Sequence, residues 1–212
     1  MTALLATAPA EAAWPPLARD FFERPTEEVA RALLGMYIVS QSANELAVAR
    51  IVETEAYGGP ADRASHARAG VTRRTGPMFG PVGHAYVYLV YGLHSCLNVV
   101  ARRDAIAGAV LLRSAQPVHG VGVMRARRSR QTDADHRLAA GPARLAQALA
   151  VDRRLDGHDL TRGELLWLAD GGPLGAVEIR SGPRVGVGYA GAEWSTREWR
   201  FWLAANPAVS RR

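Results

Sequence analysis

The stretch LAVARIVETEAY, residues 46–57, predicts a β-strand and decides how the rest of the chain is interpreted. A short turn separates it from a second strand-like run, MYIVSQ, at residues 36–41. Side chains two apart in a strand share a face, so Glu53, Glu55 and Tyr57 point the same way. Two carboxylates beside an aromatic ring do not suit an apolar core. They indicate either a solvent-exposed strand face with an arginine as ion-pair partner, or a catalytic carboxylate at the rim of a pocket.

Helix-like and strand-like segments alternate irregularly along the remaining chain. Helices are predicted at 24–35 and 141–151, strands at 84–92, 97–103 and 108–117, and further strands and turns at 176–207. A long Gly-, Pro- and Arg-rich loop region, 58–85, is typical of a functional loop. The mixture predicts an α+β fold with a curved, mostly antiparallel sheet and peripheral helices. We expect one domain over residues 17–208, preceded by a disordered tail at residues 1–16.

The charge of the chain is positive and comes entirely from arginine. Among 212 residues the formal net charge is +6, and all 26 basic residues are arginine. Guanidinium groups suit contacts to phosphate. The absence of lysine excludes a lysine Schiff base as a covalent intermediate. A basic composition alone leaves nucleic-acid binding open.

Cysteine usage and hydropathy limit the other classes of protein. Cys96 is the single cysteine, so an internal disulfide is excluded, and no Cys/His spacing typical of zinc is present. We therefore expect no metal, no cofactor and a reducing compartment, the cytoplasm with its nucleoid. No apolar run is long enough to span a bilayer, so no membrane partner is expected. No coiled-coil or apolar stripe is evident, and a monomer is expected.

Aromatic residues gather in the segment YVYLVYG. Tyr86 and Tyr88 share a strand face, and Tyr91 lies at the strand end before a glycine. A single tyrosine stripe is usually core or exposed sheet. Together with Tyr57 and His66, these tyrosines indicate a platform for flat aromatic ligands.

These segments, in this order and at this spacing, resemble the alkyladenine (3-methyladenine) DNA glycosylase family of the mammalian type, which is distinct from the helix-hairpin-helix type. The resemblance covers most of the chain. It is carried by ARDFFERPTEEVARALLG, RIVETEAY, the SH pair at 65–66, MFGPVGHAYVYLVYGLHSCLNVV, AVLLRSAQP, GPARLAQALAVD and GPRVGVGYAG. It implies a bacterial, monofunctional base-excision-repair enzyme acting on damaged duplex DNA. Such an enzyme flips out 3-methyladenine, 7-methylguanine, hypoxanthine or ethenoadenine and hydrolyses the N-glycosidic bond with a glutamate-activated water.

The resemblance also implies roles for the residues at the predicted platform. Glu55 matches the general base that activates water, and Arg113 matches the arginine that fixes the site. Tyr57, His66 and Tyr88 match the residues that sandwich the extruded base. A carboxylate there would stabilise an oxocarbenium-like transition state and take a proton from water.

Further residues are implied to select the base and to contact DNA. Tyr91 matches the residue that fills the gap in the duplex, and Asn98 matches the asparagine that crowds the amino group of normal guanine. Glu53 has no assigned chemistry and is interpreted as an ion-pair partner of a nearby arginine. Expected DNA contacts are Leu93, His94, Arg184, the helix start at Pro142 and the arginines of segment 125–130, for which a solvated charged face is the alternative.

Two other functions fit parts of the same pattern. A non-enzymatic single-strand-binding module explains the tyrosines and arginines, but it leaves the two glutamates unexplained because carboxylates repel phosphate. A carbohydrate hydrolase could use Glu53 and Glu55 as an acid and base pair, but the basic charge is then unexplained. A zinc deaminase lacks its Cys/His ligands.

Overall fold

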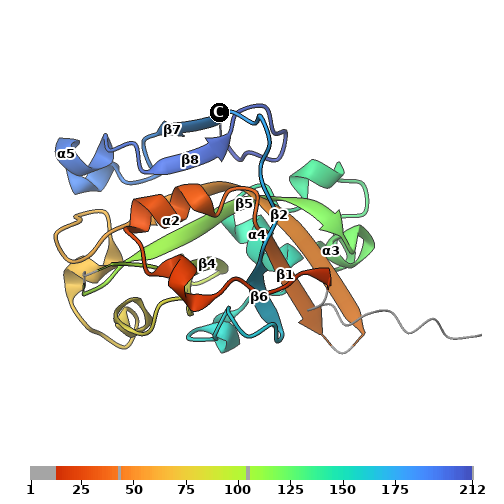
Figure 1. The fold of residues 1–212 in the computed structure, drawn as a ribbon, viewed down its shortest axis with the longest axis horizontal. Coiled ribbons are helices and arrows are strands. Elements are labelled where there is room, and N and C mark those ends of the chain that lie inside the picture. The colour runs from red at the N-terminus through yellow and green to blue at the C-terminus, as the bar shows by residue number, and fades with distance from the viewer. Residues whose placement is uncertain (1–12, 43, 104–105, 212) are drawn as a thin grey trace, which may run out of the picture.

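A computed structural model describes residues 13–42, 44–103 and 106–211, which form one domain around a twisted sheet (Figure 1). Of the tail expected at 1–16, residues 1–12 lie outside the described residues. Trp14 and Pro16 already contact the sheet: the Trp14 carbonyl accepts from Trp167 Nε1 at 2.8 Å, and Pro16 bridges to Ala169.

The sheet has eight described strands, and every pairing between neighbours is antiparallel. The strands are β1 Tyr37–Ser42, β2 Glu45–Tyr57, β3 Ala85–Val90, β4 His94–Val100, β5 Ala109–His119, β6 Leu166–Ala169, β7 Ile179–Gly182 and β8 Arg200–Leu203. Their order is β3-β4-β5-β2-β1-β6, and β8 pairs with both β2 and β7. The predicted α+β fold with a mostly antiparallel sheet is confirmed.

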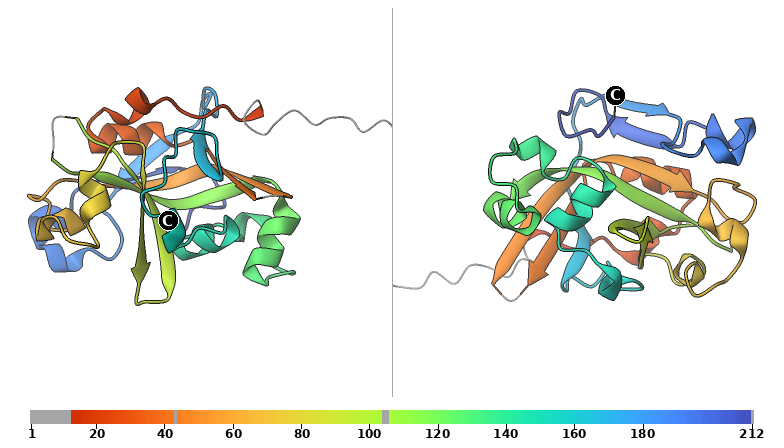
Figure 2. Two further views of the ribbon diagram at one scale, coloured as in Figure 1. Left: turned by 90° about the horizontal axis from the view of Figure 1, so that it is seen from below. Right: turned by 180° about the vertical axis from the view of Figure 1, so that it is seen from behind.

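Short helices cover both faces and the ends of the sheet. The α-helices are α2 Thr26–Ala32, α3 Val121–Arg128, α4 Pro142–Ala148 and α5 Ala192–Ser195. Single 3₁₀ turns are η1 Arg19–Phe22, η2 His66–Ala69, η3 Gly76–Phe79, η4 Asp135–Arg137, η5 Arg153–Leu155 and η6 Gly188–Ala190. Figure 2 shows α2 and α4 on opposite faces of the sheet. None of the helices in the described ranges is long and apolar enough to cross a membrane.

Strand β2 is the centre of the fold because it changes partners along its length. Its first half pairs with β1, and residues 53–55 pair with β8 instead. Register shifts on either side of Glu53 mark irregular pairing with β5, a feature often found beside active sites. On one face the Thr54 hydroxyl donates to the Ala30 carbonyl of α2 at 2.7 Å. On the other face Glu53 and Glu55 are fully buried, so the solvent-exposed strand face considered above is wrong.

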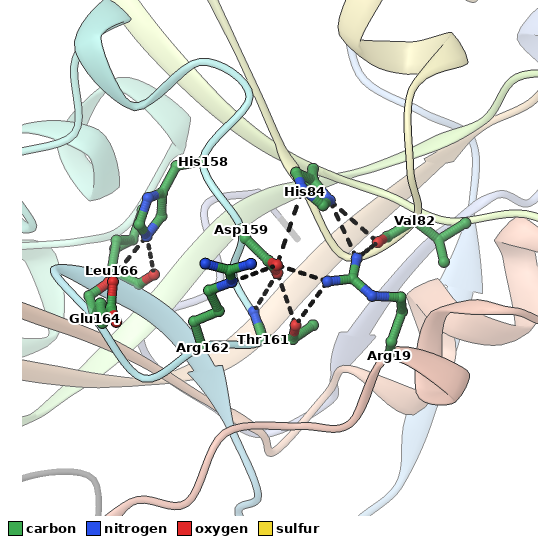
Figure 3. Close-up of polar contacts among 9 residues, drawn as sticks. All are labelled: Arg19, Val82, His84, His158, Asp159, Thr161, Arg162, Glu164 and Leu166. Atoms are coloured by element: carbon green, nitrogen blue, oxygen red, sulfur yellow. Dashed lines mark hydrogen bonds and ion pairs between the residues drawn. The ribbon is translucent and has the colours of Figure 1, made fainter.

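Asp159 ties three distant segments together near the start of β3 (Figure 3). Arg19 of η1 donates to Asp159 at 2.6 Å and to the Val82 carbonyl at 2.5 Å. The Thr161 hydroxyl and the Arg162 guanidinium also donate to Asp159, at 2.7 and 3.2 Å. Burial raises the pKa of Asp159, but hydrogen bonds from Thr161 and Arg19 outweigh it and bring the pKa to about 2. The ionised Asp159 carboxylate therefore fixes the position of the segment just before β3, the strand that carries the tyrosines.

Candidate active site

A cavity of about 550 Å³ opens between the β3–β4 hairpin, the loop region 58–83 and the segment around Val185. The sequence-predicted residues that line it are Tyr57, His66, Tyr86, Tyr88, Tyr91, Asn98, Arg113 and Pro142. They come from β2, η2, β3, the hairpin tip, β4, β5 and the start of α4. The fold thus brings together residues that lie up to 85 positions apart along the chain (57 to 142).

Glu55 lies behind the wall of this cavity, fully buried and held by three groups that line it: the Val185 N–H, Arg113 and Tyr57. Its Oε1 accepts from the Val185 backbone N–H at 2.6 Å and lies 3.4 Å from Arg113 Nη1. Its Oε2 accepts from the Tyr57 hydroxyl at 2.8 Å. Burial raises the pKa of the Glu55 carboxyl, while Arg113, the Val185 N–H and the Tyr57 hydroxyl oppose the rise. A fixed, desolvated carboxyl of this kind is suited to accept a proton from water.

Glu53 lies beside Glu55 in a closed ionic network. Its Oε1 accepts from Arg113 Nε at 3.2 Å and from Arg200 Nη1 at 3.0 Å. Its Oε2 accepts from the Ser210 backbone N–H at 2.7 Å. Burial lowers the pKa of Arg113, but the two carboxylates outweigh this and raise it. Arg113 therefore bridges the two glutamates, and Glu53 has the ion-pair geometry expected of it.

Aromatic rings form the wall of the cavity. The His66 and Tyr88 rings meet edge to face, with centroids 4.6 Å apart, and His66 Nδ1 lies 2.9 Å from the Tyr86 hydroxyl. Burial lowers the pKa of His66 to about 4, helped by the charges of Arg74 and Arg68. At neutral pH the imidazole is therefore uncharged and can stack against a flat ligand.

Asn98 and Cys96 lie at the floor of the same cavity. The Asn98 side-chain amide donates to the Tyr86 carbonyl at 2.9 Å, and only 2% of the residue is exposed. This bond fixes the amide against the sheet, facing the cavity that it lines. Cys96 is buried, and burial raises the pKa of its thiol to about 11.

The tip of the β3–β4 hairpin carries exposed apolar side chains. Tyr91 is 90% exposed and has a positive φ of 53°, a strained conformation for a bulky residue. Leu93 is 77% exposed, and His94 is exposed beside it. An apolar tip at the mouth of a cavity has the form of a wedge.

Arg184 does not have the position expected for a DNA contact. Its guanidinium is fully buried and donates to Asp62 at 2.6 and 3.0 Å and to the Ala56 carbonyl at 2.9 Å. It also lies over the rings of Tyr57 and Trp199, at 4.9 and 5.1 Å. In this structure the Arg184 side chain is committed to Asp62 and supports Tyr57 from behind, which does not favour the predicted contact with DNA.

The arginines of segment 125–130 are mostly paired within the protein. Arg125 pairs with Asp135, Arg127 with Glu45 at 3.1 Å, and Arg128 with Asp133 at 3.3 Å. These three guanidinium groups are largely buried against their carboxylate partners, which argues against a dedicated phosphate site and also against a fully solvated face.

The cavity lining also includes residues that were not among the sequence-predicted site residues, and those with polar or backbone groups of interest are Arg74, Cys96, Val185 and Tyr189. Arg74 lies in the loop region already indicated as functional, but nothing in its local sequence distinguishes it from Arg73. Val185 contributes a backbone N–H, which no side-chain pattern reveals. In the described ranges, no three His, Cys, Asp or Glu side chains gather so as to hold a metal ion. The cavity thus combines a flat aromatic wall and an exposed apolar wedge, with a buried carboxyl directly behind its lining.

Comparison with known proteins gives a consistent result. The model of the family described as methylpurine-DNA glycosylase (MPG) matches residues 20–207. A protein of Methanocella arvoryzae, named "Putative 3-methyladenine DNA glycosylase", is 44% identical over 93% of this chain and 97% of its own length. Proteins with the same name from Streptomyces avermitilis and Anaeromyxobacter dehalogenans (strain 2CP-1) are 45% and 48% identical. Each covers 92% of this chain, and 91% and 85% of its own length.

Proposed function

We propose a mechanism on the premise that this chain belongs to the methylpurine-DNA glycosylase family, which makes it a DNA glycosylase, a hydrolase of N-glycosyl bonds in DNA. In our proposal its substrates are alkylated or deaminated purines: 3-methyladenine, 7-methylguanine, hypoxanthine and ethenoadenine. It acts in base excision repair as a monomer that extrudes the damaged nucleotide from duplex DNA.

The observation that carries this proposal is the buried Glu55 carboxyl directly behind the wall of an aromatic cavity, where it is held by the lining residues Tyr57, Arg113 and Val185. An extruded purine would stack between Tyr57 and the His66–Tyr88 pair, while Tyr91 fills the vacancy in the duplex. A water held by Glu55 then attacks C1′ of the deoxyribose. The C1′–N9 bond breaks with its electron pair on the base, and Glu55 takes the proton of the water.

The proposed chemistry is monofunctional and leaves an intact abasic site. The chain has no lysine to form a Schiff base with the sugar. We expect borohydride to trap no covalent enzyme–DNA adduct during excision. A trapped adduct at a yield that matches base release would contradict a water-based mechanism.

The test is release of free base from a duplex that carries one hypoxanthine or one 1,N6-ethenoadenine, with EDTA present. We expect the wild-type protein to release the base under single-turnover conditions and to leave an undamaged duplex intact. Glu55→Gln keeps the volume of the side chain and should still bind the damaged duplex. It should lose excision by about 10²–10⁴-fold, the range for a lost general base. A Glu55→Gln protein that excises at the wild-type rate, or a wild-type protein that releases no base, would refute the proposal.

A further inference from the structure

Among the described lining side chains whose pKa is shifted by burial, none is suited to donate a proton to a departing base at neutral pH. Burial lowers the pKa of His66 to about 4, so its imidazole carries no spare proton. Burial raises the pKa of Tyr86 to about 12 and that of Cys96 to about 11, so both hold their protons too tightly. Burial likewise raises the pKa of Tyr57 well above its ordinary value.

This matters for a neutral purine such as hypoxanthine. When its bond to C1′ breaks, the electron pair stays on the base, which then carries negative charge. Without protonation, that charge requires a fixed cation or hydrogen-bond donor near the base. A 7-methylguanine nucleotide differs because its base is already cationic and departs as a neutral molecule.

Arg74 is the cationic side chain placed to meet that requirement. It lines the cavity, and its guanidinium carbon lies 5.4 Å from the centroid of the Tyr88 ring. Its charge lowers the pKa values of both His66 and Tyr86, as expected of a cation beside that wall. Within the part of the chain that the structure describes, no acidic side chain forms an ion pair with Arg74.

The other charged groups near the cavity are already paired with one another. Arg113 also lines the cavity, but its charge is offset by Glu53 and Glu55. Glu55 accepts hydrogen bonds from Tyr57 and the Val185 N–H, whereas Arg74 lies 5.4 Å from the centroid of the Tyr88 ring. The two groups thus contact different residues of the cavity wall, and Arg74 is the lining cation without a carboxylate partner among the described residues.

We propose that Arg74 is a catalytic residue for neutral bases: it donates an N–H to the departing purine and stabilises the negative charge left by cleavage of the C1′–N9 bond. This inference rests on the function proposed above. The base leaves as an anion paired with the guanidinium and is protonated afterwards by solvent water, while Glu55 receives the proton of the attacking water. Arg74 gives no such help to a cationic base and disfavours its binding by charge repulsion.

The test compares two lesions in one protein and one adjacent control. Arg74→Gln and Arg73→Gln are assayed by single-turnover release of hypoxanthine and of 7-methylguanine, with enzyme in excess. Arg73 is exposed on the same loop and does not line the cavity.

We expect Arg74→Gln to slow hypoxanthine release by about 10²–10³-fold, the cost of losing one preorganised donor. Release of 7-methylguanine should be no slower than in the wild type. Arg74→Lys keeps the charge and should recover part of the hypoxanthine rate, and Arg73→Gln should leave the ratio of the two rates unchanged.

Equal loss on both lesions would overturn the proposal, since it would indicate a structural or DNA-binding role. An unchanged hypoxanthine rate in Arg74→Gln would overturn it as well. A wild-type protein that releases neither base would refute the proposed function itself, and the role of Arg74 would fall with it.

Discussion

Replacing Glu53 by glutamine should destabilise the protein strongly, although the two side chains have nearly the same volume. The Glu53 carboxylate is fully buried, and three donors surround it: Arg113 at 3.2 Å, Arg200 at 3.0 Å and the Ser210 N–H at 2.7 Å. Glutamine still offers one oxygen, but its amide is neutral and its NH₂ faces groups that also donate. Arg113 keeps Glu55 as a partner at 3.4 Å, whereas Arg200 has no other described carboxylate in ion-pair contact.

Removing one partner of a buried ion pair costs about 3–5 kcal/mol in the free energy of unfolding. In a protein of this size, a change of about 1 kcal/mol lowers the melting temperature by roughly 2–4 °C, so the decrease should be about 6–20 °C. Urea unfolding measured by circular dichroism gives the free energy, and Glu178→Gln is the matched control. Glu178 pairs with Arg180 at 2.9 Å on the surface, where such a pair contributes about 0–1 kcal/mol. If Glu53→Gln unfolds at the same urea concentration as Glu178→Gln, the network does not stabilise the fold as we infer.

Three further predictions concern selectivity, pH and salt. Asn98→Ala should release more guanine from a G·T mismatch than the wild type, because the amide fixed by the Tyr86 carbonyl no longer crowds the 2-amino group. Single-turnover assays check this, and a variant that is active on hypoxanthine but releases no extra guanine would contradict it. Burial raises the pKa of Glu55 above the ordinary glutamate value of about 4.3, and a protonated carboxyl cannot act as a base. The excision rate should therefore fall as the pH is lowered through the raised pKa of Glu55. A single-turnover rate that stays constant below that pKa would contradict a glutamate base. Arg184 is buried, and Arg125, Arg127 and Arg128 are paired within the protein. We therefore expect DNA binding to neutralise roughly four phosphates, which gives a slope of log K against log salt concentration of about −3.6. Fluorescence anisotropy measures this slope. A slope near zero would exclude a phosphate-based interface.

Much of the site could be predicted from the sequence, because strand periodicity and the order of motifs both constrain it. The two-residue spacing placed Glu53, Glu55 and Tyr57 on one face, and the hydrogen bond between Tyr57 and Glu55 agrees with that placement. Periodicity cannot show what covers a face, so the complete burial of Glu53 by Arg200 and the C-terminal segment was not foreseen.

Other residues were misplaced or missed because their partners lie far away in the sequence. Arg184 follows Asp62 by 122 positions, and no local pattern reveals that these two side chains form a buried pair. The same holds for the Val185 N–H, whose acceptor Glu55 is 130 positions earlier. Composition indicated a basic surface, but it could not separate free arginines such as Arg74 from those already neutralised by neighbours.

The contact between Glu53 and Ser210 spans 157 positions of the chain, and it has a consequence for how the protein folds. Contacts of such long sequence separation form late, because the entropy lost on closing the chain must be offset before they contribute. The strand that carries Glu55 can pair with β1 early, but β8 and the segment after it must arrive before the buried carboxylates gain their partners. Partly folded chains therefore contain the aromatic residues without a working carboxyl. Base excision should consequently appear only after β8 and the C-terminal segment have packed against β2.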